Sequence, residues 1–136
     1  MANKTIEGGC LCGAVRYRVA GEPYNLTNCH CIMCRKASAA PFVSWASFKS
    51  NEIKFTKDAP TRYTSSAKAV RSFCSKCGTP LTFQLIECPD EIDLTICSMD
   101  EPGDIVPRDH VWTQRRLPWI KLADGLPQYN QERNDG

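Results

Sequence analysis

Seven of the nine cysteines in this 136-residue sequence lie in three short motifs, and their spacing constrains the fold more than any other feature. The motifs occupy residues 10–12, 29–34 and 74–77. An odd number of cysteines leaves one thiol over in any complete set of disulfides, and the N-terminal MANKTIEGG lacks the apolar segment of a secretion signal. Clustered cysteines in a reducing compartment indicate metal binding or catalysis. We therefore expect a cytoplasmic protein built around metal ligands.

The length and composition fit one compact domain. Hydrophobic residues make up 42% of the chain and charged residues 24%, which is ordinary for a globular protein. We expect a single zinc-binding domain over 1–136, with its core at about 6–129 and a polar tail at 130–136. The formal charge is only +2 and becomes more negative when thiolates bind metal, so it indicates neither a nucleic-acid partner nor a membrane partner.

Hydrophobic and polar residues alternate along much of the chain, which predicts half-buried β-strands. In the stretch 14–20, for example, Val15, Tyr17 and Val19 alternate with two arginines. We expect a mainly β fold with strands at 14–20, 42–48, 52–56, 62–66, 69–73, 81–86 and 91–97.

One segment predicts a helix. Residues 31–40, CIMCRKASAA, contain enough helix-forming residues for one or two turns, and Pro41 would end them. The second cysteine motif therefore lies where this helix begins. The N–H groups and partial positive charge of a helix N-terminus stabilise thiolates, which favours metal ligation and nucleophilic chemistry alike.

The motif at 74–77 has the form of a zinc knuckle. Cys74 and Cys77 flank a tight turn, and Gly78 lets the backbone close so that amide N–H groups point at sulfur. Cys10 and Cys12 are the obvious second pair, because glycines on both sides permit a bend. Four cysteines close a tetrahedral site, so we predict a structural zinc that ties the first strand to the later sheet. The alternative, a redox dithiol, normally opens a helix in a β–α–β unit, which this sequence lacks.

Cys29, Cys31 and Cys34 remain as a set of three. Catalytic zinc usually has three protein ligands and a fourth position that water or substrate can occupy. We therefore predict a second, catalytic zinc with an open position, which gives two Zn²⁺ per chain. Such a position can polarise a carbonyl group, lower the pKa of a bound water or accept a thiolate.

Alternatives remain open for this second motif. His30 would close the site if it served as a fourth ligand. The three thiols could instead form a redox sensor with a transient disulfide, whereas an iron–sulfur cluster would normally need a fourth cysteine. Cys88 and Cys97 have no partner at ligand spacing, and we expect a turn or edge thiol at 88 and a packed thiol within a strand at 97.

Four segments resemble one known family. GGCLCGAVRY, CHCIMCRK, FCSKCGTPL and DHVWTQRRLPW are similar to motifs of the glutathione-dependent formaldehyde-activating (GFA) family, and the resemblance covers residues 6–129. It implies a β-tent of packed antiparallel sheets with two zinc sites. It also implies the division of ligands reached above, with a structural zinc on Cys10, Cys12, Cys74 and Cys77 and a catalytic zinc on Cys29, Cys31 and Cys34.

In the reaction that gives this family its name, glutathione adds to formaldehyde to form S-hydroxymethylglutathione, and the associated class is carbon–sulfur lyase. The resemblance therefore implies such a lyase, acting on glutathione or a related thiol and on formaldehyde or another small aldehyde. The alternatives are a zinc-stabilised thiol-binding or protein-interaction module without turnover, and the thiol redox sensor.

Two further groups of residues are candidates for the site. Arg35 and Lys36 follow the second motif and either attract glutathione carboxylates or are solvated charges on the helix. His110 belongs to the C-terminal segment that resembles the family, and it is either a proton shuttle or a structural hydrogen-bonding residue. The same segment contributes Trp112, Arg115, Arg116 and Trp119, and we expect the two tryptophans to form core or pocket wall.

Overall fold

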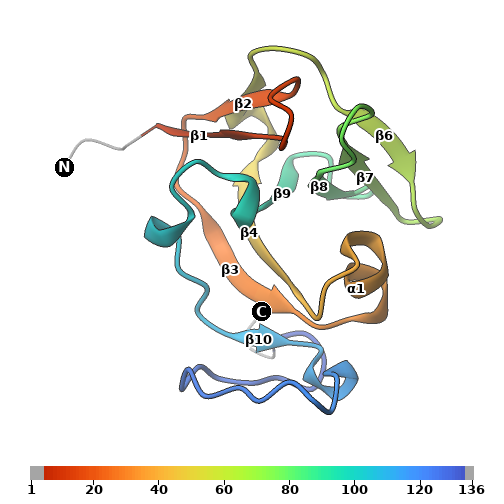
Figure 1. Cartoon of the computed structure of the whole chain (residues 1–136), viewed down its shortest axis with the longest axis vertical. Coiled ribbons are helices and arrows are strands. Elements are labelled where there is room, and N and C mark those ends of the chain that lie inside the picture. The colour runs from red at the N-terminus through yellow and green to blue at the C-terminus, as the bar shows by residue number, and fades with distance from the viewer. Residues whose placement is uncertain (1–4, 134–136) are drawn as a thin grey trace.

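Two β-sheets frame the protein in the computed structural model, which describes residues 5–133 (Figure 1). The smaller sheet is antiparallel, with the strand order β1-β2-β5. The larger has the order β10-β3-β4-β9-β8-β7-β6, and its pairs are antiparallel except for a short parallel pair between β10 and β3. The strands are β1 (Ile6–Gly9), β2 (Arg16–Val19), β3 (Tyr24–Cys29), β4 (Val43–Lys49), β5 (Ile53–Phe55), β6 (Thr61–Thr64), β7 (Ala69–Phe73), β8 (Pro80–Leu85), β9 (Glu91–Thr95) and β10 (His110–Val111).

The prediction of a mainly β fold is confirmed, and each strand predicted from alternation is present within a few residues. Three strands were not predicted, namely β1, β3 and β10. The sequence of β1 is rich in glycine because it packs tightly: a Cβ atom on Gly8 would lie 2.6 Å from the Ser98 carbonyl oxygen. In β3, Asn28 occupies a buried position and receives a 2.5 Å hydrogen bond from the Ser44 hydroxyl, so no apolar alternation marks the strand.

The predicted helix is present as α1 (Ile32–Ser38), with Cys31 as its N-cap. It ends earlier than Pro41 requires, because Ala39 adopts a left-handed conformation with φ of 50°. The remaining helical segments are 3-10 turns, η1 (Ser50–Glu52), η2 (Ile96–Ser98), η3 (Pro102–Asp104) and η4 (Thr113–Arg115). None of the helices within residues 5–133 has the length and apolar character needed to cross a membrane.

The prediction that Cys97 packs within a strand is wrong. Strand β9 ends at Thr95, whose hydroxyl donates to the Pro80 carbonyl oxygen, and the chain then turns into η2. Cys97 lies in that turn and is exposed. Cys88 is exposed in the turn between β8 and β9, as predicted.

The two faces of the larger sheet have different environments. On β4, Ala46 and Phe48 point into the main core, which lies against the smaller sheet and includes Tyr17 and Leu94. Trp45, on the opposite face, belongs to a second cluster with Cys29, Cys34, Val43 and Val111. Alternation along the strands therefore places one face on the core and leaves the other to line a site.

Candidate metal centres and the adjoining cavity

The first motif and the zinc-knuckle motif come together between the two sheets. Cys10 and Cys12 lie in the β1–β2 connection and Cys74 and Cys77 in the β7–β8 connection, and their four sulfur atoms lie within 4.8 Å of one another. The sulfurs of Cys10 and Cys12 are 3.6 Å apart, and those of Cys12 and Cys74 are 3.8 Å apart. Tetrahedral geometry with metal–sulfur bonds of about 2.3 Å requires about 3.8 Å between sulfurs. The four-cysteine cluster thus has the spacing of a tetrahedral metal site.

Backbone N–H groups face the sulfurs of this four-cysteine cluster. The N–H of Val15 donates to Cys10 Sγ at 3.2 Å, and the N–H of Lys76 donates to Cys74 Sγ at 3.4 Å. Gly78 closes the turn with φ of +81°, a conformation that favours glycine. These donors stabilise thiolates, which are the form that binds metal.

Thr79 connects the two halves of the cluster. Its hydroxyl oxygen accepts a hydrogen bond from the N–H of Leu11 at 3.0 Å and lies 3.2 Å from Cys77 Sγ. The hydroxyl hydrogen bond is the main reason why the pKa of Cys77 is lowered to about 5. Loss of this hydroxyl would remove a contact on both sides of the cluster.

The second motif forms a three-cysteine cluster at the junction of β3 and α1. Cys29 ends β3, Cys31 caps the helix and Cys34 lies in its first turn, so their sulfurs lie within 4.8 Å of one another. The N–H of Cys34 donates to Cys31 Sγ at 3.3 Å, and Arg71 Nη2 lies 3.8 Å from Cys34 Sγ. The pKa of Cys31 is lowered because the thiols of Cys29 and Cys34 hydrogen-bond to its sulfur. This set of donors suits a metal with three protein ligands.

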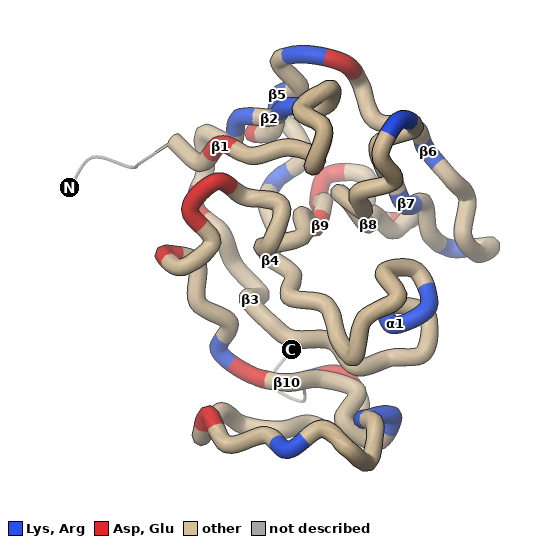
Figure 2. The backbone as a smooth tube through the Cα atoms, in the orientation of Figure 1, with Lys and Arg blue, Asp and Glu red and all other residues tan. Residues whose placement is uncertain are grey.

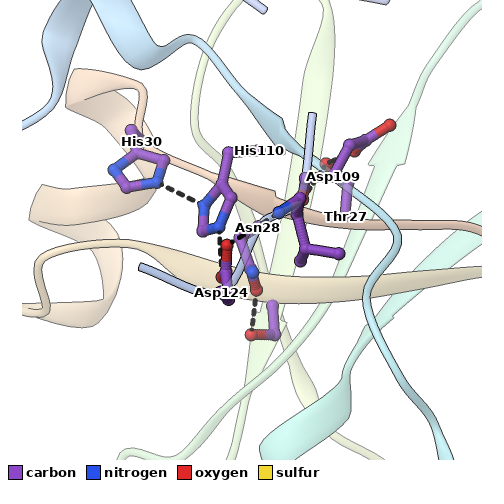
Figure 3. A network of polar contacts seen from close by, with 8 residues as sticks. Thr27, Asn28, His30, Asp109, His110 and Asp124 are labelled. Atoms are coloured by element: carbon purple, nitrogen blue, oxygen red, sulfur yellow. Dashed lines mark hydrogen bonds and ion pairs between the residues drawn. The ribbon is translucent and has the colours of Figure 1, made fainter. Parts of the chain in front are cut away.

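His30 is not a member of the three-cysteine cluster, although it lies between two of its residues. Its ring is fully buried, and its Nε2 lies 2.9 Å from His110 Nδ1 (Figure 3). His110 Nε2 in turn lies 2.7 Å from the carboxylate of Asp124. Burial lowers the pKa of His30 to about 4, with a further contribution from His110, so the ring is neutral at pH 7. The structure therefore does not support the alternative in which His30 is the fourth metal ligand.

The side-chain contacts from His30 to His110 and from His110 to Asp124 join the three-cysteine loop to the C-terminal segment. His110 opens β10 and pairs with Asn28 of β3, and the N–H of His30 donates to the Val111 carbonyl oxygen at 3.0 Å. Both ring nitrogens of His110 have partners, and its side chain is only 1% exposed. This environment favours the structural reading of His110 over a proton shuttle. Asp124 belongs to no recognisable motif, so its contact with His110 was not predicted from the sequence.

We expect Asp124→Ala to lower the free energy of unfolding, because it removes the hydrogen-bond partner of the buried His110 Nε2. Asp124→Asn is the matched control, since its amide oxygen can still accept from that nitrogen. Urea unfolding of the two variants measures the difference. Equal stabilities for the alanine and asparagine variants would show that the hydrogen bond to His110 contributes nothing.

A cavity of about 630 Å³ opens beside the three-cysteine cluster, and all three cysteines line it. The four-cysteine cluster does not line this cavity. The floor is the face of the larger sheet opposite the main core, with residues that include Thr27, Trp45, Ser47, Arg71, Phe83 and Asp93. The guanidinium of Arg71 lies over the Phe83 ring at 4.9 Å and over the Trp45 ring at 6.0 Å. Arg71 is thus held beside the cluster by two aromatic faces.

The C-terminal candidates divide between this cavity and the surface. Trp112 and Arg115 line the cavity, and Trp112 has a left-handed backbone with φ of 58°, which is rare for a bulky residue. Trp119 is 66% exposed and so does not belong to the core, but it lines a second pocket, which agrees with the other prediction for it, a pocket wall. Arg35 and Lys36 line a second pocket with Trp119 and are absent from the main cavity. Arg71, which was not a candidate from the sequence, contacts Cys34 Sγ through its guanidinium group.

Comparisons with known proteins identify relatives of this chain. A Schizosaccharomyces pombe protein described as an uncharacterized lyase is 35% identical over 77 residues, which are 57% of this chain and 56% of that protein. The chain thus spans little more than half the length of this relative. A Halomonas elongata protein provisionally named glutathione-dependent formaldehyde-activating enzyme is 27% identical over an alignment of 134 positions, and the alignment covers 86% of this chain and 80% of that protein.

The fold also has a counterpart among solved structures. A crystal structure of a Rhodobacter sphaeroides protein superposes with a TM-score of 0.58 at 21% identity, covering 90% of this chain and 98% of the other. The sequence model of a family described as glutathione-dependent formaldehyde-activating enzyme matches residues 5–115, which is most of the chain. The protein therefore belongs to the glutathione-dependent formaldehyde-activating enzyme family.

Proposed function

We propose that this protein is a carbon–sulfur lyase that adds glutathione, or a closely related thiol, to formaldehyde or another small aldehyde. The observation that carries the proposal is the contrast between the two cysteine clusters. The four-cysteine cluster has a full tetrahedral set of ligands and lies outside the cavity, whereas the three-cysteine cluster lines the cavity and offers one ligand fewer. Closed sites are typically structural, and sites with three protein ligands are typically catalytic.

The residues present fit zinc at both places. Cysteine thiolates are soft ligands that bind zinc well, and both groups of sulfurs are close enough to share one ion. Cys10, Cys12, Cys74 and Cys77 would hold a structural zinc, and Cys29, Cys31 and Cys34 a catalytic one. When bound there, zinc supplies Lewis acidity, which favours thiolate over thiol and polarises a carbonyl group.

The chain's own residues supply positioning and electrostatics. Trp45, Phe83 and Trp112 give the cavity an aromatic lining, which would lower the local polarity around the reacting groups. Arg71, 3.8 Å from Cys34 Sγ, places a positive charge beside the position where the aldehyde oxygen gains negative charge. The thiol loses its proton, the sulfur forms a bond to the carbonyl carbon as the π bond of the C=O group breaks, and the oxygen keeps that electron pair and takes up a proton. No electron is gained or lost overall, so the step needs no redox cofactor.

Exchange NMR of formaldehyde with glutathione tests this proposal. We expect the protein to increase the exchange rate between free formaldehyde and the hydroxymethyl adduct above the rate in buffer. The matched control is Cys88→Ser, which removes an exposed thiol outside both clusters and should retain the enhancement. An exchange rate equal to that of buffer would rule out the reaction for this protein.

A further inference from the structure

The carboxylate of Asp93 lies on the floor of the cavity away from the cysteines, and the lining also includes Glu91 and Glu132. Asp93 of β9 is paired across the sheet with Ser47 of β4 on one side and Phe83 of β8 on the other, and all three line the cavity. One of its oxygens, Oδ1, accepts a 2.5 Å hydrogen bond from the Ser47 hydroxyl. Because Asp93 belongs to a central strand, its position is fixed by ladder pairing on both sides.

This carboxylate has no cationic partner in the part of the chain that the structure describes. None of the ion pairs within residues 5–133 involves Asp93. Within the same residues, no hydrogen-bond donor contacts its second oxygen, Oδ2. Burial raises the pKa of Asp93 to about 6, and the neighbouring charge of Glu91 adds to this effect. The carboxylate is therefore partly desolvated, with the Ser47 hydroxyl as its one recorded side-chain donor within residues 5–133, and a ligand of opposite charge would offset the remaining cost.

The distance from Asp93 to the three-cysteine cluster separates two possible roles. Cys29 is paired with Val43, and Ser47, the strand partner of Asp93, lies four residues further along β4. At about 3.3 Å per residue, the separation along the strand is about 13 Å. A general acid or base must come within about 3 Å of the atom it serves, or act through one water. Asp93 is therefore too far from the cysteines to act as acid or base there, and its position suits contact with a remote part of a ligand whose thiol lies at the cysteines.

We propose that Asp93 and Ser47 form a subsite that binds the free ammonium group of the thiol substrate. The inference rests on the proposed function, in which the substrate is glutathione and the group is the α-ammonium of its γ-glutamyl residue. Eight bonds join this nitrogen to the sulfur, a span of about 10 Å when extended. An ammonium–carboxylate hydrogen bond at one end and a bond from sulfur to a metal at the other lengthen this span, so that glutathione can bridge the separation of about 13 Å between the cysteines and Asp93.

The charges around the cavity are arranged to receive such a ligand. Glutathione also carries two carboxylates, and the cavity lining includes the basic residues Lys68, Arg71 and Arg115. Figure 2 shows acidic positions on β9 and basic positions on β6, β7 and α1. The acidic strand thus receives the ammonium group while basic side chains from other elements remain available to the carboxylates.

Binding measurements on the zinc-loaded protein test the subsite directly. The probes are glutathione and glutaryl-cysteinylglycine, which is glutathione with the ammonium group replaced by hydrogen. We expect calorimetry to show that the unmutated protein binds glutathione roughly 10- to 100-fold more tightly than the analogue, the range of a charged hydrogen bond. In Asp93→Asn, this preference should fall to nearly 1-fold while the affinity for the analogue stays unchanged.

Two controls separate binding from structure. The asparagine oxygen of Asp93→Asn can still accept from Ser47 and removes a desolvated charge, so its thermal unfolding temperature should be no lower than that of the unmutated protein. Asp104→Asn neutralises an exposed carboxylate in η3 that does not line the cavity, and it should retain the full preference for glutathione.

Each other outcome has a definite meaning. A preference for glutathione that survives in Asp93→Asn overturns the subsite, as does an equal loss of affinity for both probes, which indicates a structural role. If the unmutated protein binds neither probe, glutathione is not its thiol, and both this assignment and the proposed substrate fail. If the preference depends on Asp93 but formaldehyde exchange stays at the buffer rate, the subsite stands and the proposed reaction fails.

Discussion

Cys74→Ser is expected to abolish cooperative folding at 25 °C. Cys74 is 1% exposed and contributes to the cluster that joins the β1–β2 connection to the β7–β8 connection. A structural zinc contributes about 10–16 kcal/mol in zinc-finger peptides, which is as large as the whole folding free energy of a typical domain. Loss of one ligand should therefore remove most of the stability. Near-ultraviolet circular dichroism during a thermal scan measures the loss.

The control for this prediction is Cys88→Ser, the same chemical change at an exposed turn outside both clusters. It should unfold at the temperature of the unmutated protein. A folded Cys74→Ser variant with an unchanged unfolding temperature would show that the four-cysteine cluster does not hold the two sheets together.

Cys31→Ser is expected to abolish activity and leave the fold intact. The change removes one of the three ligands that line the cavity, and metal assistance of this kind is worth several kcal/mol of transition-state stabilisation, so the rate enhancement should fall about 1,000-fold or to the buffer rate. The fold should persist because Cys31 is the N-cap of α1, where serine is a preferred residue. Exchange NMR measures the rate, and urea unfolding measures the stability.

Cys97→Ser serves as the control, because Cys97 is exposed in η2 and belongs to neither cluster. It should retain both activity and stability. An active Cys31→Ser variant would contradict the assignment of the three-cysteine cluster as the reaction centre. An unfolded one would indicate that this cluster, like the other, is structural.

The features that were predictable from the sequence depend on short-range spacing. The alternation around Tyr17 predicts a strand because side chains on a strand point to opposite faces with a period of two. The motif at 74–77 predicts a tight turn with both thiols on one side, and Gly78 has the positive φ that such a turn needs. The grouping of cysteines into four and three, predicted from the number of ligands in each type of site, is also the grouping of the sulfurs in the structure.

The features that were missed depend on contacts between distant parts of the chain. Asp93 occupies the polar position of an alternating strand, where the pattern indicates solvent, but this face of the sheet lines a cavity. Arg71 reaches Cys34 across 37 residues of sequence. His30 was a candidate ligand because of its neighbours, and only its contact with His110, 80 residues away, shows that its ring serves another purpose. Such pairings leave no local signal.

The zinc content of the folded protein tests the central claim, that one cluster holds a structural ion and the other a catalytic one. Metal analysis is made on the reduced protein before and after Cys31→Ser. We predict about two zinc ions per chain in the unmutated protein and about one in the variant, with the fold retained. One zinc per chain in the unmutated, fully reduced protein would contradict the claim.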